Sequence, residues 1–252
     1  MKKNSALSLE RVSKIFFDPP VHGSAEAFTA IKDINLEIEK GELFELVGPS
    51  GSGKSTLLRI MSGLDREFTG SVKIASDITP FDISFVFQEF ALLPWLTVRE
   101  NIELGLLARD IAKEKRFHLV EQEIKTLRLE GFGQRYPREL SGGMKQRVGI
   151  ARALVTNPKI IFMDEPFSEL DSFTVEELRK ELLSIWAQRR PTIVMVTHII
   201  EEAVELGDSI AVLTPTPGKI EKILKNTLPR PRQKRSLDFF QLEDAIYKLI
   251  RP

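Results

Sequence analysis

The sequence contains no cysteine. Disulfide bonds, zinc–thiolate sites, iron–sulfur clusters and cysteine nucleophiles are therefore excluded. Long apolar runs are also missing, because stretches such as residues 193–196 are far shorter than the ~20 residues that span a bilayer. The basic residues near the amino terminus are not followed by an apolar stretch, so we expect no signal peptide.

The chain has no excess of charge of either sign. Lys and Arg together number 36, and Asp and Glu together number 36. This balance lacks the electrostatic signature of a nucleic-acid binder, although it leaves room for a local basic patch, and we expect no nucleic-acid partner. The length of 252 residues, with 42% hydrophobic and 29% charged residues, is typical of one large globular domain or a domain with a subdomain.

Hydrophobic patterning predicts an α/β protein. Residues 31–38 alternate apolar and polar side chains, as in a half-buried antiparallel strand, and residues 9–17 are also predicted to be a strand. The continuous apolar runs 160–163 and 193–196 are typical of buried parallel strands, and a helix over 174–188 would join them in a β-α-β crossover.

Two further regions differ from this core in their pattern. From about residue 89 to residue 155, the sequence pattern is mostly that of helices, which predicts a helical subdomain inserted into the α/β core. The tail, 229–252, follows a Pro/Arg-rich stretch and is predicted to form an amphipathic helix after Ser236. The apolar face of that helix would pack on its own domain or offer a surface to a partner.

A glycine-rich loop follows the short apolar stretch 43–47. Residues 48–56 fit the pattern G-x-x-x-x-G-K-[ST], whose backbone N–H groups cradle phosphates at a helix N-terminus. Lys54 is expected to reach the β- and γ-phosphates of a nucleotide, and the Ser55 hydroxyl is expected to bind Mg²⁺. The predicted phosphate-binding residues are Gly48, Pro49, Ser50, Gly51, Ser52, Gly53, Lys54, Ser55 and Thr56.

Two acidic residues end another apolar strand. Asp164 and Glu165 would lie at the carboxyl end of the sheet, where α/β proteins bind ligands. We expect Asp164 to hold Mg²⁺ through water and Glu165 to activate the attacking water. Together with the phosphate loop, they predict a P-loop nucleotide hydrolase, which leaves kinases, GTPases and motor ATPases open.

Residues 140–147, Leu-Ser-Gly-Gly-Met-Lys-Gln-Arg, narrow this choice. Ser141, Gly142 and Gly143 at a predicted helix N-terminus would make a second anion site. The stretch resembles the signature motif of ABC ATPases. The resemblance implies that two subunits pack head-to-tail around two ATPs, each γ-phosphate meeting Lys54 of one subunit and the signature loop, with Gln146, of the other.

The remaining elements of that family occur in the expected order. Gln88 matches the Q-loop glutamine of the Mg²⁺ and water shell, and Asp171 matches the D-loop aspartate at the dimer interface. His198 matches the switch histidine that contacts the γ-phosphate. Phe16 lies where the family places an adenine-stacking aromatic residue, with Phe17 as the alternative.

The resemblance extends over most of the chain. It implies a RecA-like P-loop NTPase fold: a mixed sheet core, an N-terminal antiparallel β subdomain and the inserted helical subdomain, all within a single ATPase domain of residues 1–228. Three residues depart from the family pattern. Glu45 replaces a small or apolar residue, Glu169 replaces an alanine in the D-loop, and Ile199 replaces the aspartate that commonly follows the switch histidine.

The stretch 87–98 and the tail resemble the nitrate/sulfonate/taurine branch of bacterial importer ATPases. That branch implies an ATPase homodimer at the cytoplasmic face of the membrane, two permease subunits and an external solute-binding protein. Trp95 would line the groove for a permease helix, or belong to the core of the helical subdomain. The alternatives are an importer of another solute branch, a soluble ABC ATPase without a transport role, and a non-hydrolysing regulatory subunit.

Overall fold

A computed structural model describes residues 4–17 and 27–250 of the chain. The chain forms two compact units, here called unit 1 (residues 1–78 and 192–252) and unit 2 (residues 79–191). In the described parts of the chain, no helix is both long and apolar enough to cross a membrane.

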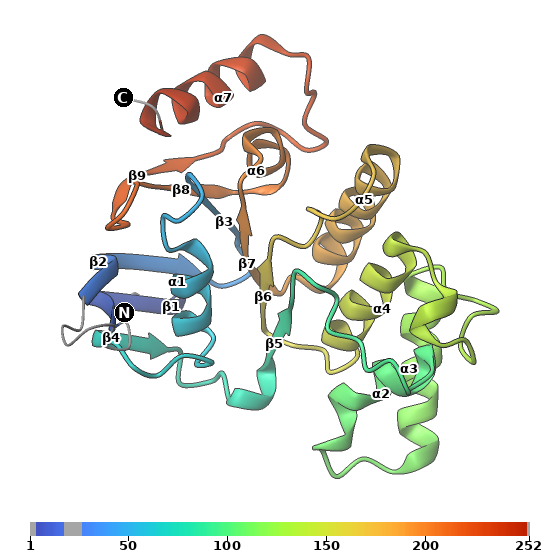
Figure 1. The fold of residues 1–252 in the computed structure, drawn as a ribbon. Helices are drawn as coiled ribbons and strands as arrows, with labels where there is room; N and C mark the ends of the chain where they lie inside the picture. Colours follow the sequence, from blue (N-terminus) through green and yellow to red (C-terminus); the bar gives the residue numbers. More distant parts are fainter. Residues whose placement is uncertain (1–3, 18–26, 251–252) are drawn as a thin grey trace, which may run out of the picture. The chain divides into compact units, whose positions relative to one another are not determined.

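Unit 1 begins with a three-stranded antiparallel sheet in the order β2-β1-β4 (Figure 1). Its strands are β1 (Ser5–Phe17), β2 (Ala27–Glu39) and β4 (Thr69–Ile74). Leu9 pairs with Leu36 and Val12 pairs with Ile34, and all four side chains are buried on this sheet. Both predicted strands are therefore present, and each begins about four residues earlier than the apolar alternation indicated.

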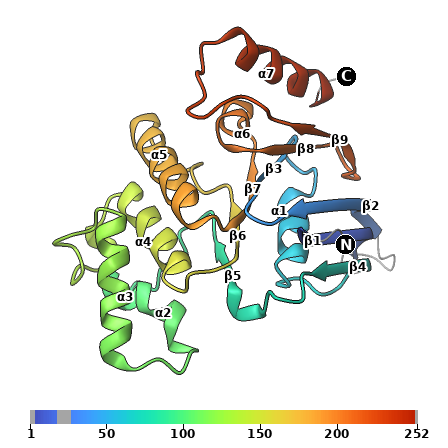
Figure 2. The ribbon, with the colours of Figure 1, turned by 180° about the vertical axis from the view of Figure 1, so that it is seen from behind.

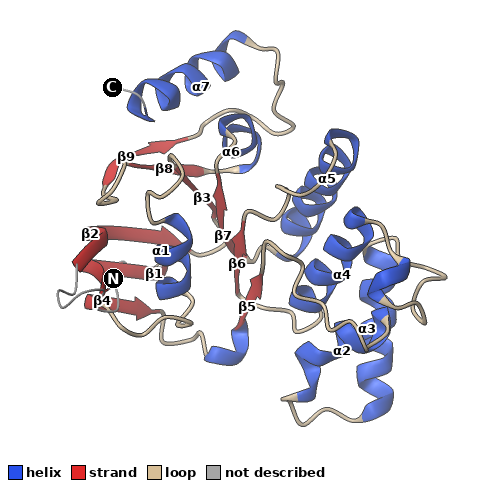
Figure 3. Ribbon diagram, in the orientation of Figure 1, coloured by secondary structure: helices blue, strands red, loops and turns tan. Residues whose placement is uncertain are grey.

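A second sheet of unit 1 has the strand order β7-β3-β8-β9 (Figure 3). Its strands are β3 (Leu43–Val47), β7 (Thr192–Thr197), β8 (Ser209–Leu213) and β9 (Ile220–Lys225). β3 runs parallel to β7 and β8, whereas β9 is antiparallel to β8. The three parallel strands are buried along their whole length, which explains their nearly continuous apolar sequence.

The described residues of unit 1 form three helices: α1 (Lys54–Met61), α6 (Ile200–Leu206) and α7 (Leu237–Ile250). The tail helix α7 lies beside α6, as Figure 2 shows from behind, and buries Phe239 and Ile246 against Ala203, Val204 and β8. The apolar face of the tail is therefore packed on its own unit, and the exposed face carries Phe240 and Tyr247.

The segment between β9 and α7 binds the C-terminal end of α6 through two arginines. Arg230 donates to the Leu206 carbonyl and to Asp208, and Arg232 donates to the carbonyl oxygens of Val204 and Glu205 at 3.0 and 2.9 Å. Cations at this position satisfy the unpaired carbonyls of the last helical turn and complement its dipole.

Unit 2 contains two parallel strands and most of the helices. Its elements are η1 (Pro80–Asp82), β5 (Ile83–Val86), α2 (Val98–Leu107), α3 (Lys113–Thr126), η2 (Pro137–Glu139), α4 (Gly142–Leu154), β6 (Ile160–Asp164) and α5 (Ser172–Arg189). β5 pairs with β6, and α2 packs on both α3 and α4. The predicted α/β architecture, with a mixed sheet and an antiparallel N-terminal sheet, is confirmed.

Candidate functional site

The phosphate loop joins β3 to α1 in unit 1. Gly53 forms the N-cap of α1 with φ +82°, in the left-handed region that favours glycine. A Cβ at Gly53 would lie 2.4 Å from Ile31 Cγ2 and 2.9 Å from the Ala30 carbonyl oxygen. Both backbone conformation and close packing therefore require glycine at this end of the loop.

Lys54 is buried and folds back over the loop. Its ammonium donates to the carbonyl oxygens of Gly48 and Pro49, each at 2.9 Å. These contacts hold a full positive charge beside the N–H groups at the beginning of α1, which makes the loop an electropositive cradle. Ser55 follows in the first turn of α1, and its hydroxyl is an oxygen donor of the type that Mg²⁺ prefers.

A turn between β8 and β9 supports the phosphate loop from outside. The Thr216 hydroxyl donates to the Gly51 carbonyl at 2.7 Å, and Gly218 lies so close to Ser52 that a Cβ would come within 2.0 Å of its carbonyl oxygen. The sequence analysis missed these residues. The available signal was the cluster Thr-Pro-Thr-Pro-Gly at 214–218, which marks a turn but does not reveal what the turn contacts.

His198 follows β7, the neighbour of β3. Because Val47 pairs with Thr197 in the parallel ladder, His198 and Gly48 leave the same edge of the sheet. The side chain of His198 is exposed. The structure thus brings the predicted switch histidine and the phosphate loop to one edge of unit 1.

Phe16 lies at the far end of β1 and is 42% exposed, while Phe17 is 71% exposed. Neither ring is buried in a hydrophobic core, whereas most aromatic residues of β-strands are. The ammonium of Lys14 lies 5.0 Å from the centroid of the Phe16 ring, and Asp65 holds that ammonium at 3.0 Å. One face of the Phe16 ring is thus contacted by a fixed cation.

Unit 2 contributes a separate group of predicted residues. Val86 of β5 pairs with Met163 of β6, so Gln88, which follows β5, and Asp164–Glu165, at the end of β6, lie at the same edge of these parallel strands. Asp164 is buried, and Glu165 has φ +43°. A residue other than glycine pays roughly 1–2 kcal/mol for this conformation, and such strain is concentrated at functional sites. The Ser168 hydroxyl, which donates to the Glu165 carbonyl at 3.0 Å, helps to hold it.

The predicted signature loop begins α4. Ser141 is the N-cap, and its hydroxyl accepts from the Met144 N–H at 3.3 Å. Gly142 and Gly143 form the first turn, whose N–H groups make an anion site of the expected kind. Gln146 is fully buried, and neither polar atom of its amide has a hydrogen-bond partner among the described residues. It can therefore act on a nucleotide only through the loop that it supports.

The helix that follows the predicted D-loop, α5, packs against the predicted signature loop. A Cβ at Gly143 would lie 2.4 Å from Thr174 Cγ2. Asp171, the N-cap of α5, fixes Thr174 by accepting from its N–H at 3.0 Å and from its hydroxyl at 2.6 Å. The hydrogen bond from the Thr174 hydroxyl lowers the pKa of Asp171. Thr174, which the sequence analysis did not select, therefore links the two predicted in-trans elements.

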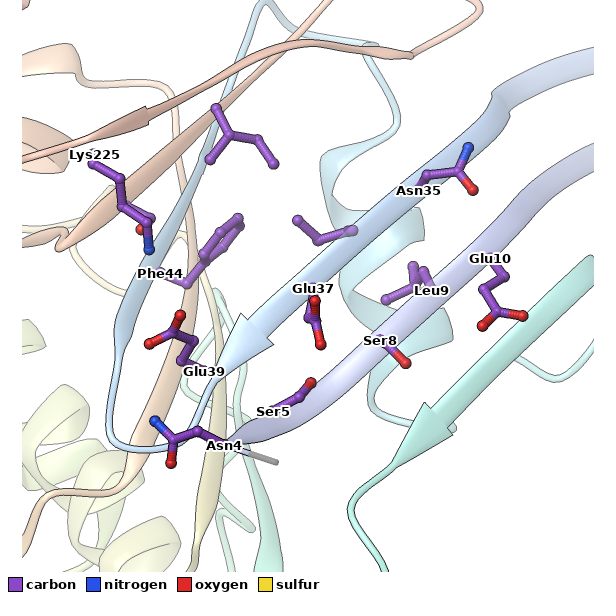
Figure 4. Close-up of a pocket in the computed structure, with 13 residues that line it drawn as sticks. Asn4, Ser5, Ser8, Leu9, Glu10, Asn35, Glu37, Glu39, Phe44 and Lys225 are labelled. Atoms are coloured by element: carbon purple, nitrogen blue, oxygen red, sulfur yellow. The ribbon is translucent and has the colours of Figure 1, made fainter. Parts of the chain in front are cut away.

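A hollow beside the N-terminal sheet contains none of the predicted site residues. It has a volume of about 660 Å³ and is lined by side chains of β1, β2, β3, β8 and β9 (Figure 4). Lys225 beside it pairs with the buried Glu42 at 2.9 Å. The predicted site is therefore formed by loops at strand ends and not by this hollow.

Comparison with known proteins identifies a consistent set of relatives. A profile of the ABC transporter family matches residues 31–168. The aliphatic sulfonates import ATP-binding protein SsuB of Bacillus cereus is 43% identical over 95% of this chain and 94% of its own length. The nitrate import ATP-binding protein NrtD of Synechocystis is 41% identical over 91% of each chain.

Solved structures agree with these sequence relatives. The dimeric post-hydrolysis state of the ATP-binding cassette MJ0796, bound to ADP and Pi, superposes with a TM-score of 0.75 at 37% identity and covers 87% of this chain and 98% of its own. CbiO1 of Clostridium perfringens, part of an ABC transporter complex, gives a TM-score of 0.76 at 25% identity over 98% of this chain and 95% of its own.

Proposed function

Because this chain belongs to the ABC transporter family, we propose that it is the ATP-hydrolysing subunit of a membrane importer for a small sulfonate- or nitrate-type anion. Relatives with sulfonate and nitrate import names match nearly the whole chain, which favours this role over a soluble ABC ATPase without transport and over another solute branch. The chain carries the ATPase domain of the family.

The geometry of Glu165 is the observation that carries the hydrolytic role. This carboxylate comes directly after a buried strand, in a strained conformation that the Ser168 contact maintains. In the proposed mechanism Glu165 takes a proton from the attacking water. Lys54, His198 and the signature loop of the second subunit neutralise the charge that develops on the γ-phosphate.

Magnesium would be held by the oxygen donors of Ser55 and Gln88, with Asp164 acting through water. Hydroxyl, amide and carboxylate oxygens suit this hard cation, which keeps several waters and binds mainly through substrate phosphates. When bound, such an ion would supply positive charge that offsets the negative charge of the nucleotide phosphates. The residues present therefore fit a Mg²⁺–ATP substrate.

The proposed assembly is a head-to-tail homodimer with two ATPs between the subunits. Ser141, Gly142 and Gly143 offer a second anion site at a helix N-terminus, which a nucleotide held by another copy of the chain could occupy. Asp171 is placed beside them through Thr174. Phe16 is proposed to stack on the adenine.

The transport partners are inferred from the importer relatives. We propose two permease subunits, an external solute-binding protein that delivers the anion, and a location at the cytoplasmic face of the membrane. Trp95 is 68% exposed, which argues against the alternative that it belongs to the core of unit 2 and favours contact with a permease helix.

ATP hydrolysis by the purified chain, measured over a range of protein concentrations, tests this function. We expect turnover per subunit to rise with concentration, because each site needs two copies of the chain. Glu165→Gln should be inactive yet dimerise with ATP, because only the water-activating carboxylate is lost. Glu114→Gln, at an exposed position of α3, is the matched control and should retain activity.

The result that would refute the shared site is turnover per subunit that stays flat with concentration, together with a Glu165→Gln chain that stays monomeric in ATP. Repeating both measurements on the complex with its co-expressed permease covers the case in which the permease brings the two subunits together. Flat turnover and no ATP-dependent closure in that complex would overturn the proposal.

A further inference from the structure

The turn that carries His198 is fixed by two buried residues that the proposed mechanism does not use. Thr197, the last residue of β7, is 3% exposed, and Glu202, in the first turn of α6, is 2% exposed. The Thr197 hydroxyl donates to Glu202 Oε2 at 2.9 Å. The same hydroxyl accepts from the Ile199 N–H at 3.0 Å. The residues on both sides of His198 are therefore joined by hydrogen bonds, while its own side chain stays exposed.

This arrangement replaces an ordinary helix cap. The N-cap position of α6 is Ile199, which has no side chain that could accept a hydrogen bond. In a capping box, a glutamate at the third helical position bonds directly to the N-cap N–H. Here the Thr197 hydroxyl stands between the two groups, accepting from the N-cap N–H and donating to Glu202. At the N-cap residue Ile199, the backbone N–H is thus satisfied by the Thr197 hydroxyl.

The opposite end of α6 is fixed as well. Arg230 and Arg232 bind its last carbonyl groups, and Phe239 of α7 packs on the same side of unit 1. With α6 immobilised by the tail, the contact between Thr197 and Glu202 sets the position of the His198 turn relative to β7. Because β7 pairs with β3, it also sets that position relative to the phosphate loop.

We infer that Thr197 and Glu202 are positioning residues for His198, holding the imidazole where it can meet the γ-phosphate. The inference rests on the proposed function, since it assigns a role in the same reaction. Neither side chain touches the nucleotide in this account. Their effect passes through the backbone of residues 197–199.

The test compares matched variants in the ATPase assay. Thr197→Val keeps the shape and removes the hydroxyl, and Glu202→Ala removes the acceptor. Each should lower kcat about ten-fold, the equivalent of one lost hydrogen bond, with KM changed less than about two-fold. Thr197→Ser and Glu202→Gln keep a donor and an acceptor and should stay near wild type. Glu201→Gln, the exposed neighbour, is the control.

A double-mutant cycle separates positioning from general stability. In the His198→Ala background, Thr197→Val should cause no further loss of kcat, because the residue it positions is gone. An additional ten-fold loss in that background would overturn the inference. Thermal unfolding identifies variants that fail to fold. If Thr197→Val does not fold, the same double-mutant cycle is measured with Glu202→Ala in its place.

The imidazole resonances of His198 provide a readout that does not depend on hydrolysis. Thr197→Val should shift them, while those of His118, in α3 of unit 2, should stay in place. Unshifted His198 resonances would refute the positioning role even in an active enzyme. If wild type hydrolyses no ATP, the proposed function fails, and this measurement still decides whether Thr197 and Glu202 position the histidine.

Discussion

Replacing Gly143 by alanine tests the contact between the signature loop and α5. A Cβ at this position would lie 2.4 Å from Thr174 Cγ2, and the Thr174 Cβ is the next atom, at 3.7 Å. A single methyl group is therefore in the way. That methyl cannot rotate aside freely, because rotation would break the 2.6 Å hydrogen bond from the Thr174 hydroxyl to Asp171.

The expected cost is the difference between two opposing effects. Overpacking a well-filled site costs about 1–3 kcal/mol. Replacing glycine by alanine in a helix stabilises the folded state by roughly 0.5–1 kcal/mol, because alanine has the higher helix propensity. From the middle of each range, the net destabilisation is about 1 kcal/mol, which corresponds to a decrease in Tm of roughly 2–4 °C for a protein of this size.

Urea and thermal unfolding measure this effect, with two further variants as controls. Gly149→Ala lies in the same helix, and its Cβ would meet only the Phe90 carbonyl oxygen at 3.5 Å, an ordinary contact. It should be neutral or slightly stabilising. The double variant Gly143→Ala/Thr174→Ser lacks the offending methyl and keeps the hydroxyl for Asp171, so it should recover most of the lost stability.

Two results would refute this reasoning. The first is a Gly143→Ala chain as stable as Gly149→Ala. The second is a double variant that remains as unstable as the single one, because the clash with Thr174 would then not be the cause. ATPase activity is measured on the same variants. If the signature loop acts in trans as proposed, the double variant should hydrolyse ATP faster than Gly143→Ala, because the loop has regained its position.

Two further predictions concern the tail. Arg232→Ala should destabilise unit 1 by about 3 kcal/mol, because it removes two bonds to the end of α6 and the cation that acts on the buried Glu45. Exposed Arg235→Ala should stay within about 0.5 kcal/mol of wild type in the same urea titration. Phe239→Ala should cost about 3–5 kcal/mol, since its ring is 1% exposed, whereas Phe240→Ala, 53% exposed, should cost little. Equal losses in either pair would contradict the packing described for the tail.

The fold was predictable wherever a pattern is local. The apolar runs at 160–163 and 193–196 identified buried parallel strands, and Ser236 marked the start of the tail helix. The phosphate loop was equally clear, because its function requires glycines at fixed spacing. Thr216 and Thr174 were not predictable, since each acts by touching a loop distant in the sequence, and no local pattern records that contact.

Glu45 departs from the family pattern, and the sequence alone does not explain why. Its surroundings in the fold come from residues that are distant in the sequence. A carboxylate with no exposed surface in the centre of a sheet needs compensating charge. Arg232 brings a positive charge into this part of unit 1: burial lowers the pKa of its guanidinium to about 10, and Asp208, Glu45 and Glu205 are the acids that oppose the shift. The same side chain donates to the last carbonyl groups of α6. The strand residue that departs from the family pattern therefore lies within electrostatic reach of the Pro/Arg-rich tail, which no local sequence pattern could reveal.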